Sequence, residues 1–397
     1  MDDHIFDQLL QGFKYVPENT SYLEIFNYTD PVHDVIESRP LTPDEFQNFL
    51  QRQGAYAAPV IPKDVQLKAG LRIIVQENAK HRDTFTSHYI TLPPDVYRSM
   101  MMSFGLPLSA IECTSTVGPL FWSSYNHDES DPQLHIIVRK ADMRKKGKTR
   151  GWELVLSYSF RDKITTAFLK GTPCSNVSES LKLVKDSPSQ ICHPLLLPMT
   201  LAALYLNGSL EQRTLDGRQS LRQVEDALTF SRTPMEDSPY NDLDLNIIGR
   251  DLVEINSAML RSDPEAWMGI IGDAQKALSL FFEHLPECAR SPEITKAHHK
   301  FSSRLSLYNN RLQGMKGYVR NTQRRLEIQK FALSNLSAQR DGQVNLENNA
   351  EQRRLAHLSK QDSSSMKALS LVGVIFLPGT FLASIFSMSF FDFKGGK

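Results

Sequence analysis

The sequence predicts an α+β protein, in which a mixed α/β domain is followed by a long stalk helix that runs into a transmembrane helix. Three observations predict this class. β-rich runs bounded by turn residues crowd the stretch from residue 71 to residue 171. Apolar residues then repeat at helical spacing from residue 301 to residue 336. Finally, a charge-free apolar segment extends from residue 368 to residue 391.

The mixed domain is predicted from five β-rich runs and several helical ones. The strand candidates are LRIIVQ, SHYITLP, LHIIVRK, WELVLSYSF and ITTAFLKG. Thr42, Pro43 and Glu45 mark a helix start in TPDEFQNFLQRQ. RDLVEINSAML and PEAWMGIIGDAQKALSLFFEHL are helical, and we expect them to supply the antiparallel partner of the long helix. Residues 194–206 are apolar but too short to span a membrane, which predicts a buried helix.

A heptad seam predicts the stalk helix. Its members alternate spacings of four and three over five repeats: Phe301, Leu305, Tyr308, Leu312, Met315, Val319, Thr322, Leu326, Gln329, Leu333 and Leu336. Ser291, Pro292 and Glu293 supply a cap, a first-turn proline and an early acid. No proline lies between residues 293 and 377, so one nearly continuous helix, roughly 150 Å long, is expected to run into the membrane. The alternative is an ordinary coiled coil beside an unrelated anchor.

The apolar segment predicts a membrane span. Its 24 residues, Ala368 to Phe391, would form a helix roughly 36 Å long, against a hydrocarbon core of about 30 Å. Four basic residues precede the segment, namely Arg353, Arg354, Lys360 and Lys367, whereas Lys394 and Lys397 follow it. This mild positive-inside bias places the N-terminal side in the cytosol.

One face of the span carries most of its small and hydroxyl residues. Residues three or four apart share a helix face, and this one contains Met366, Leu369, Gly373, Leu377, Thr380, Ser384 and Ser387. Leu371, Ile375, Leu382 and Ile385 lie largely elsewhere. Two interpretations stay open: helix–helix packing through small residues, or a pore lined by several copies of the helix. Pro378 interrupts the backbone hydrogen bonds midway.

Composition excludes several other classes of protein. Lys and Arg total 45, as do Asp and Glu, so no global field points to nucleic acid, and we expect no such partner. The four cysteines lie far apart without a CxxC pair, which favours reduced thiols in the cytosol. The acidic start MDDHIFDQLL is neither a secretory signal nor a transit peptide. We therefore expect a membrane protein whose N-terminal domain is cytosolic.

Motifs of common enzymes are missing from the sequence. It contains no P-loop, no HExxH, no GxSxG and no GxGxxG before a helix, so we expect that the protein is not an enzyme. Acidic loops at 126–131 and 235–246 could collect divalent cations, but surface acid clusters are common, and metal ligands stay unassigned. The basic run at 139–150 lies between two strands and predicts a solvated hairpin.

The segment MKALSLVGVIFLPGTFLASIFSMSFF resembles the first membrane helix of the CorA magnesium-transporter superfamily, in particular its divergent fungal members. In that family a mixed α/β cytosolic domain leads into a long stalk helix that becomes the first membrane helix. The stretch Leu377-Pro378-Gly379-Thr380-Phe381 matches the family's apolar-Pro-x-Thr-Phe element. Ser387, Met388 and Ser389 stand where the family has its Gly-Met-Asn selectivity motif.

The chain departs from the family at two points. Ser387 and Ser389 replace the Gly and the Asn of the motif. A second membrane helix does not follow, so the chain is expected to be either truncated after the first membrane helix or a member with a single span.

The resemblance implies a subunit of a divalent-cation channel with a degenerate Gly-Met-Asn motif, Mg²⁺ as the transported ion and no cofactor. It also implies a lipid bilayer and self-association as partners, with a homopentamer as the family precedent. The alternative is a non-conducting, tail-anchored scaffold or regulator that keeps the cytosolic fold.

The expected organisation has five parts. They are an N-terminal variable region at 1–80, a cytosolic α/β domain with a helical hairpin at 81–290, a stalk helix or coiled coil at 291–365, a transmembrane helix at 366–391 and a short tail at 392–397. Met366, Leu369, Gly373, Leu377, Thr380 and Ser384 are the expected pore-lining residues. Ser387, Met388 and Ser389 are the expected selectivity position.

Overall fold

The computed structural model describes residues 2–116, 118–143, 149–206, 211–229, 244–261 and 264–388. The chain divides into two compact units. The first, here called the α/β unit, consists of Met1–Arg222 and Val253–Arg325. The second, here called the helical unit, consists of Gln223–Leu252 and Leu326–Lys397.

A seven-stranded mixed sheet forms the centre of the α/β unit, in the order β3-β2-β4-β9-β8-β7-β6. Its strands are β2 (Ser21–Tyr28), β3 (Val35–Pro40), β4 (Leu67–Gln76), β6 (Leu120–Asn126), β7 (Gln133–Met143), β8 (Thr149–Ser159) and β9 (Ile164–Gly171). The β4–β9 pair is parallel and the other pairs are antiparallel. A separate parallel pair joins β1 (Lys14–Tyr15) to β5 (Tyr89–Ile90).

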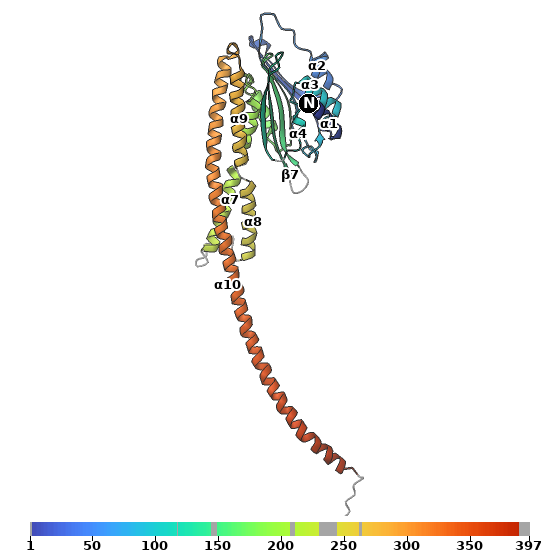
Figure 1. Cartoon of the computed structure of the whole chain (residues 1–397), viewed down its shortest axis with the longest axis vertical. Coiled ribbons are helices and arrows are strands. Elements are labelled where there is room, and N and C mark those ends of the chain that lie inside the picture. The colour runs from blue at the N-terminus through green and yellow to red at the C-terminus, as the bar shows by residue number, and fades with distance from the viewer. Residues whose placement is uncertain are drawn as a thin grey trace, which may run out of the picture. The chain divides into compact units, whose positions relative to one another are not determined.

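Helices cover both faces of this sheet (Figure 1). One face carries α1 (Asp2–Gly12), α2 (Phe46–Gln51), α3 (Pro94–Ser103) and α4 (Ala110–Cys113). The other carries α5 (Val177–Lys185), α6 (Leu196–Tyr205), α9 (Glu265–His284) and the first part of α10 (Pro292–Phe386). Because side chains alternate across a strand, Leu154 and Leu156 of β8 face one layer and Val155 the other.

The remaining helices are α7 (Glu211–Thr229), α8 (Leu245–Arg261) and α10 (Pro292–Phe386). Short 3₁₀ turns lie at Pro31–His33, Gly54–Tyr56, Pro188–Gln190 and Glu287–Ala289. The predicted helices at 250–260 and 264–285 are therefore confirmed, as is the buried helix near 194–206, whose residues Leu196, Leu197 and Met199 are buried. The mixed α/β fold followed by a very long helix is the predicted fold class.

Helix α10 extends over 95 residues without a break. The Ser291 hydroxyl accepts a hydrogen bond from the Ile294 amide at 3.2 Å, which caps the first turn as expected. The seam is buried from Phe301 to Leu326, and its residues from Phe301 to Val319 pack in one core with α9. An ion pair of 2.6 Å joins Lys316 to Glu265 at the start of α9, so the two helices are antiparallel. The partner of the seam over these residues is therefore the chain itself.

The sheet crosses one domain boundary expected from the sequence. Strands β2, β3 and β4 all precede residue 80, yet they belong to the same sheet as β6 to β9. Residues 1–80 are thus an integral part of the α/β unit. Among the strand predictions, SHYITLP contributes only the two residues of β5, whereas β2, β3 and β6 were not predicted.

Candidate functional site

The apolar end of α10 is the feature that the sequence singled out. Among the described residues, α10 is the one helix long and apolar enough to cross a membrane, with a window of mean hydropathy 2.1. None of that window is buried within the chain. A surface this apolar is unstable in water, so the segment requires lipid or other protein around it.

The six expected pore-lining residues lie on this helix, in its last part. Met366, Leu369 and Leu377 are 69%, 75% and 69% exposed, Thr380 and Ser384 are also exposed, and Gly373 is half-buried. Their spacing of three and four residues along an unbroken helix places them on one face. No other described element covers that face, so the structure leaves it open to lipid or to other copies of the chain.

The hydroxyl groups on this face are bonded within their own helix. Thr380 Oγ1 lies 3.0 Å from the carbonyl oxygens of both Phe376 and Leu377 and donates its single hydrogen there. Ser384 Oγ donates to the Phe381 carbonyl at 2.8 Å. The Thr380 hydroxyl is thus bonded to the backbone of the preceding turn. Each hydroxyl donates only its hydrogen, so Thr380 Oγ1 and Ser384 Oγ keep lone pairs that can accept a hydrogen bond from a water molecule.

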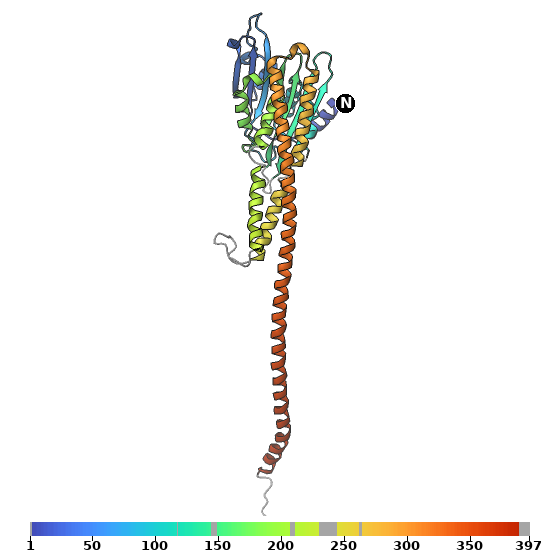
Figure 2. The same cartoon turned by 90° about the vertical axis from the view of Figure 1, so that its left-hand side faces the viewer.

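Pro378 lies inside α10 and has no amide hydrogen to give to the carbonyl of Val374. Figure 2 shows the last turns of the helix, in the darkest red, bent from the line of the preceding turns. A proline ring and its missing bond are the ordinary cause of such a bend.

The expected selectivity position lies at the end of the described chain. The Ser387 amide donates to the Ala383 carbonyl at 3.0 Å, and the Met388 amide donates to the Ile385 carbonyl at 3.2 Å. Ser387 is not among the described non-glycine residues with positive φ, so its side chain causes no left-handed strain here. Ser389 lies outside the described residues.

The acidic loops do not form a metal centre in the described part of the chain. Asp128 accepts hydrogen bonds from the amide and the hydroxyl of Ser130, which hold the pKa of Asp128 below its ordinary value. Asp131 accepts from Ser159 and Gln133. Within the described residues no group of three or more His, Cys, Asp or Glu side chains could hold a metal ion. Most of 235–246 lies outside those residues, although Asp244 caps α8 through the Asn246 amide.

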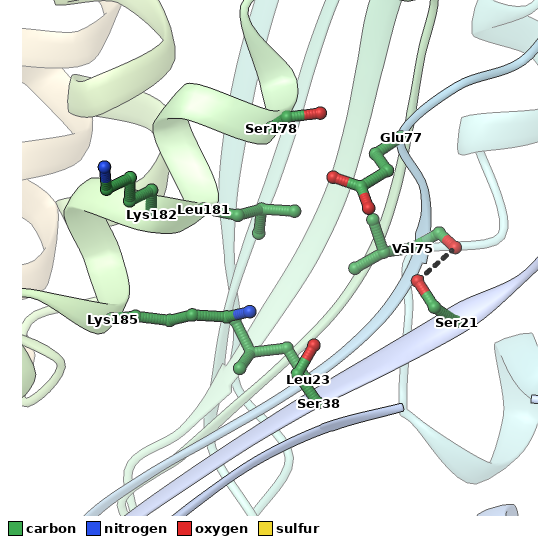
Figure 3. Close-up of a pocket in the computed structure, with 9 residues that line it drawn as sticks. All are labelled: Ser21, Leu23, Ser38, Val75, Glu77, Ser178, Leu181, Lys182 and Lys185. Atoms are coloured by element: carbon green, nitrogen blue, oxygen red, sulfur yellow. Dashed lines mark hydrogen bonds between the residues drawn. The ribbon is translucent and has the colours of Figure 1, made fainter. Parts of the chain in front are cut away.

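A cleft of about 140 Å³ lies between α5 and the edge of the sheet formed by β2, β3 and β4 (Figure 3). Leu23, Val75 and Leu181 supply its apolar wall. Lys185 reaches across toward β2, whereas Lys182 points away from the cleft (Figure 3). Glu77 is the one carboxylate among the residues that line this cleft, so the cleft lacks the several oxygen ligands that a divalent cation needs.

Sequence reasoning missed a buried charge cluster on three adjacent strands. Arg139 of β7 is paired in register with Glu153 of β8, which is paired with Lys170 of β9. Arg139 Nε lies 3.0 Å from Glu153 Oε2, and Lys170 Nζ lies 3.4 Å from Glu153 Oε1, with all three side chains at most 4% exposed. The expectation of a solvated basic hairpin is therefore wrong for Arg139 and for Lys140, which is also buried.

This cluster ties the sheet to the segments that cover it. The Arg139 guanidinium donates to the carbonyl oxygens of Cys113, Thr116 and Phe85. Burial lowers the pKa of Lys170, and the nearby Glu153 only partly offsets that effect. Burial also raises the pKa of Cys113 to about 11. These contacts compensate the buried charges inside the fold.

Comparisons with known proteins give similarities only among solved structures. No family model matches it, and no curated protein matches it. Among solved structures, the full-length CmaX protein is similar with a TM-score of 0.44 and 11% identity, over 96% of this chain and 90% of that one. The soluble domain of CorA from Methanocaldococcus jannaschii is similar with a TM-score of 0.40 and 8% identity, over 76% of this chain and 94% of that one. At these scores and identities, the two similarities carry no argument about function.

Proposed function

We propose that the chain is a membrane protein whose copies assemble a channel for hydrated divalent cations, with Mg²⁺ as the transported ion. The observation that carries the proposal is the end of α10, which is apolar, charge-free and uncovered, and which concentrates small and hydroxyl residues on one face. The sequence match of Leu377 to Phe381 with the CorA superfamily supports the same function.

The number of spans supports assembly from several copies. The described residues contribute one span per chain, and a single helix encloses no pore. Small residues such as Gly373 let helices approach closely in lipid, which favours association through this face. The resembled family assembles as a homopentamer, and we propose the same number here.

The side chains on the small and hydroxyl face of α10 suit a cation that keeps its hydration shell. Mg²⁺ loses its hydration shell reluctantly and usually retains several waters. The segment offers no carboxylate to replace them, but Thr380 and Ser384 keep acceptor lone pairs that face the same side. At the expected selectivity position, Ser389 offers a hydroxyl oxygen where the family offers a longer amide. We therefore propose slower or less selective conduction than with an intact motif.

The orientation follows from basic residues on the two sides of the span. Arg353, Arg354, Lys360 and Lys367 precede it and two lysines follow it, so the N-terminal side is proposed to be cytosolic. The α/β unit would then lie in the cytosol.

A second function has a specific observation in its favour. Thr380 is satisfied by its own backbone, and the Gly and Asn of the family motif are both replaced by serine. A non-conducting, tail-anchored scaffold or regulator would have both properties.

Mg²⁺ flux into vesicles containing the purified full-length protein separates the two functions. The wild-type protein is expected to conduct, Thr380→Val to reduce flux several-fold, and Ser389→Asn to increase it. Thr380→Val exchanges a hydroxyl for a methyl group with little change in volume. The control is Leu382→Val, a comparably small change on the opposite face, which is expected to conduct like the wild type. If the inserted wild-type protein passes no Mg²⁺, or if Thr380→Val and Leu382→Val behave alike, the scaffold function is favoured.

A further inference from the structure

The part of α10 that precedes the span separates its charges by face. Lys360 and Lys367 lie seven residues apart, with Ser364 between them at spacings of four and three, so the three share one helix face. Arg353 and His357 continue this basic face toward the N-terminus, again at spacings of four and three. All of these residues are exposed.

The acidic residues occupy a different face. Glu347 and Glu351 are four residues apart, and Asp362 follows eleven residues after Glu351, a spacing of about three turns. Asp362 in turn precedes Met366 by four residues, so the acidic face leads into the face with Gly373 and Thr380. Lys360 and Lys367 lie on the opposite side. When the small and hydroxyl face turns toward other copies, the two lysines turn outward.

The position of these lysines along the helix coincides with a membrane surface. Lys367 directly precedes the charge-free segment that starts at Ala368, and Lys360 lies eight residues before it, roughly 12 Å along the helix. The polar headgroup layer is about 5–8 Å thick on each side of the hydrocarbon core. Long lysine side chains extend their ammonium groups to that layer. Neither lysine has an acidic partner among the described residues.

We propose that Lys360, Ser364 and Lys367 form a docking site for the phosphate groups of anionic lipids in the leaflet on the N-terminal side of the span. Two ammonium groups supply charge, and the hydroxyl between them supplies a hydrogen-bond donor. The span holds the site at headgroup level, which selects lipid phosphate over free phosphate. The proposal rests on the membrane insertion proposed above and does not require that the protein conduct ions.

The test uses full-length protein in phosphatidylcholine vesicles, with and without phosphatidylserine. Spin-labelled lipids report how strongly each headgroup is preferred at the protein boundary. The wild-type protein is expected to prefer phosphatidylserine, and the preference is expected to weaken as salt is raised. The double variant Lys360→Gln/Lys367→Gln is expected to lose most of the preference for phosphatidylserine. Each lysine that is removed is expected to lower this preference about fivefold.

The matched control removes the same charge far from the membrane. Lys330 and Arg340 are exposed on the same helix, and the nearer of the two, Arg340, precedes Ala368 by 28 residues, roughly 42 Å. The double variant Lys330→Gln/Arg340→Gln should keep the wild-type preference, and so should Asp362→Asn on the opposite face.

The proposal is overturned if the Lys360/Lys367 variant keeps its preference for phosphatidylserine or loses no more of it than the Lys330/Arg340 control. It is also overturned if that variant changes the oligomeric state in phosphatidylcholine alone, because the lysines would then contact other copies.

Insertion is measured separately. Resistance to alkaline extraction from pure phosphatidylcholine vesicles reports insertion where no anionic headgroup is present. A chain that fails to insert there contradicts both this proposal and the proposed function. A chain that inserts but shows no preference for phosphatidylserine contradicts the headgroup site alone.

Discussion

Buried charges in the central sheet show how single residues constrain this fold. Moving a carboxylate or an ammonium group out of water costs several kcal/mol unless a partner compensates it. Glu153 compensates two cations, Arg139 and Lys170, and Arg139 also donates to three carbonyl oxygens of covering segments. On the same side of the sheet, Arg72 of β4 binds Glu24 of β2 at 2.6 Å and donates to the Phe49 carbonyl. Such side chains specify strand register, because a shift by one residue would leave each charge without its partner.

Glu153→Gln tests this cluster with little change in volume. The variant leaves the buried Arg139 and Lys170 without a negative partner, so we expect a loss of about 3–5 kcal/mol in the free energy of unfolding. Denaturant unfolding of the full-length protein measures the loss. The control, Asp273→Asn, breaks the exposed ion pair with Lys276 and should cost less than about 1 kcal/mol. Equal losses in the two variants would contradict a special role for the cluster.

His193 is expected to make the stability of the fold depend on pH. It is buried beside Phe281 and Phe301, and its Nδ1 accepts a hydrogen bond from the Leu195 amide at 3.3 Å. Burial holds the pKa of His193 well below its ordinary value, with nearby His298 adding to the effect. As pH falls below about 6.5, the unfolded chain takes up a proton that the folded chain resists, so stability falls with pH.

The contribution of His193 is at most about 2 kcal/mol between pH 7 and pH 5. His193→Asn keeps an acceptor for the Leu195 amide but cannot take up this proton. We expect a smaller difference in unfolding free energy between pH 7 and pH 5 for the variant than for the wild type. An unchanged difference would assign the acid sensitivity to other groups.

At the scale of elements, local sequence patterns account for what the sequence predicted. Strands β4, β7, β8 and β9 are β-rich apolar runs bounded by turn residues, whereas helices α8, α9 and α10 repeat apolar residues at helical spacing. The missed strands lack that pattern. β2 includes Glu24 and Asn27, β3 is a mostly exposed edge strand ending at Pro40, and β6 contains two serines. They form because neighbouring strands pair with them, and pairing between distant segments is not visible in a short window.

The same reasoning explains why the face of the span could be predicted from the sequence, whereas the buried charge cluster could not. The face from Met366 to Ser384 follows from spacing on one helix, so the sequence identifies its members directly. The cluster of Arg139, Glu153 and Lys170 depends on the register of three strands, which spacing alone does not give. Its signal was the presence of charged residues next to apolar ones in three strand candidates, IIVRK, WELVL and AFLKG.

The seam of α10 gives an element-scale prediction with a control two residues away. Leu305 is fully buried in the core shared with α9, whereas Leu307 is 50% exposed on the same helix. Leu305→Ala should cost about 2–5 kcal/mol of unfolding free energy through lost burial and a cavity. Leu307→Ala should cost about 0.5 kcal/mol or less. Both are measured by denaturant unfolding, and comparable losses would contradict the packing described for the seam.

At the scale of the whole molecule, the buried part of the seam does not support self-association. Its residues from Phe301 to Val319 are covered by other helices of the same chain, so they are not available to a second copy. The uncovered surface lies instead in the last part of α10, where the apolar window has no partner within the chain. For the proposed channel we therefore expect the span to contribute most to oligomerisation.

A pair of glycine substitutions in the span tests this inference. Gly373 belongs to the face with Leu377 and Thr380, whereas Gly379 lies six residues later on another face, and a Cβ at Gly379 meets no atom within 4 Å. In mild detergent we expect the full-length wild-type protein to be an oligomer by light scattering. Gly373→Leu places a bulky side chain between closely packed helices and should weaken association by about tenfold, equivalent to about 1.4 kcal/mol. Gly379→Leu adds the same volume to the same helix and should leave association unchanged. A wild-type protein that is monomeric at every concentration, yet inserts into vesicles, would contradict the channel and leave the anchored scaffold as the function.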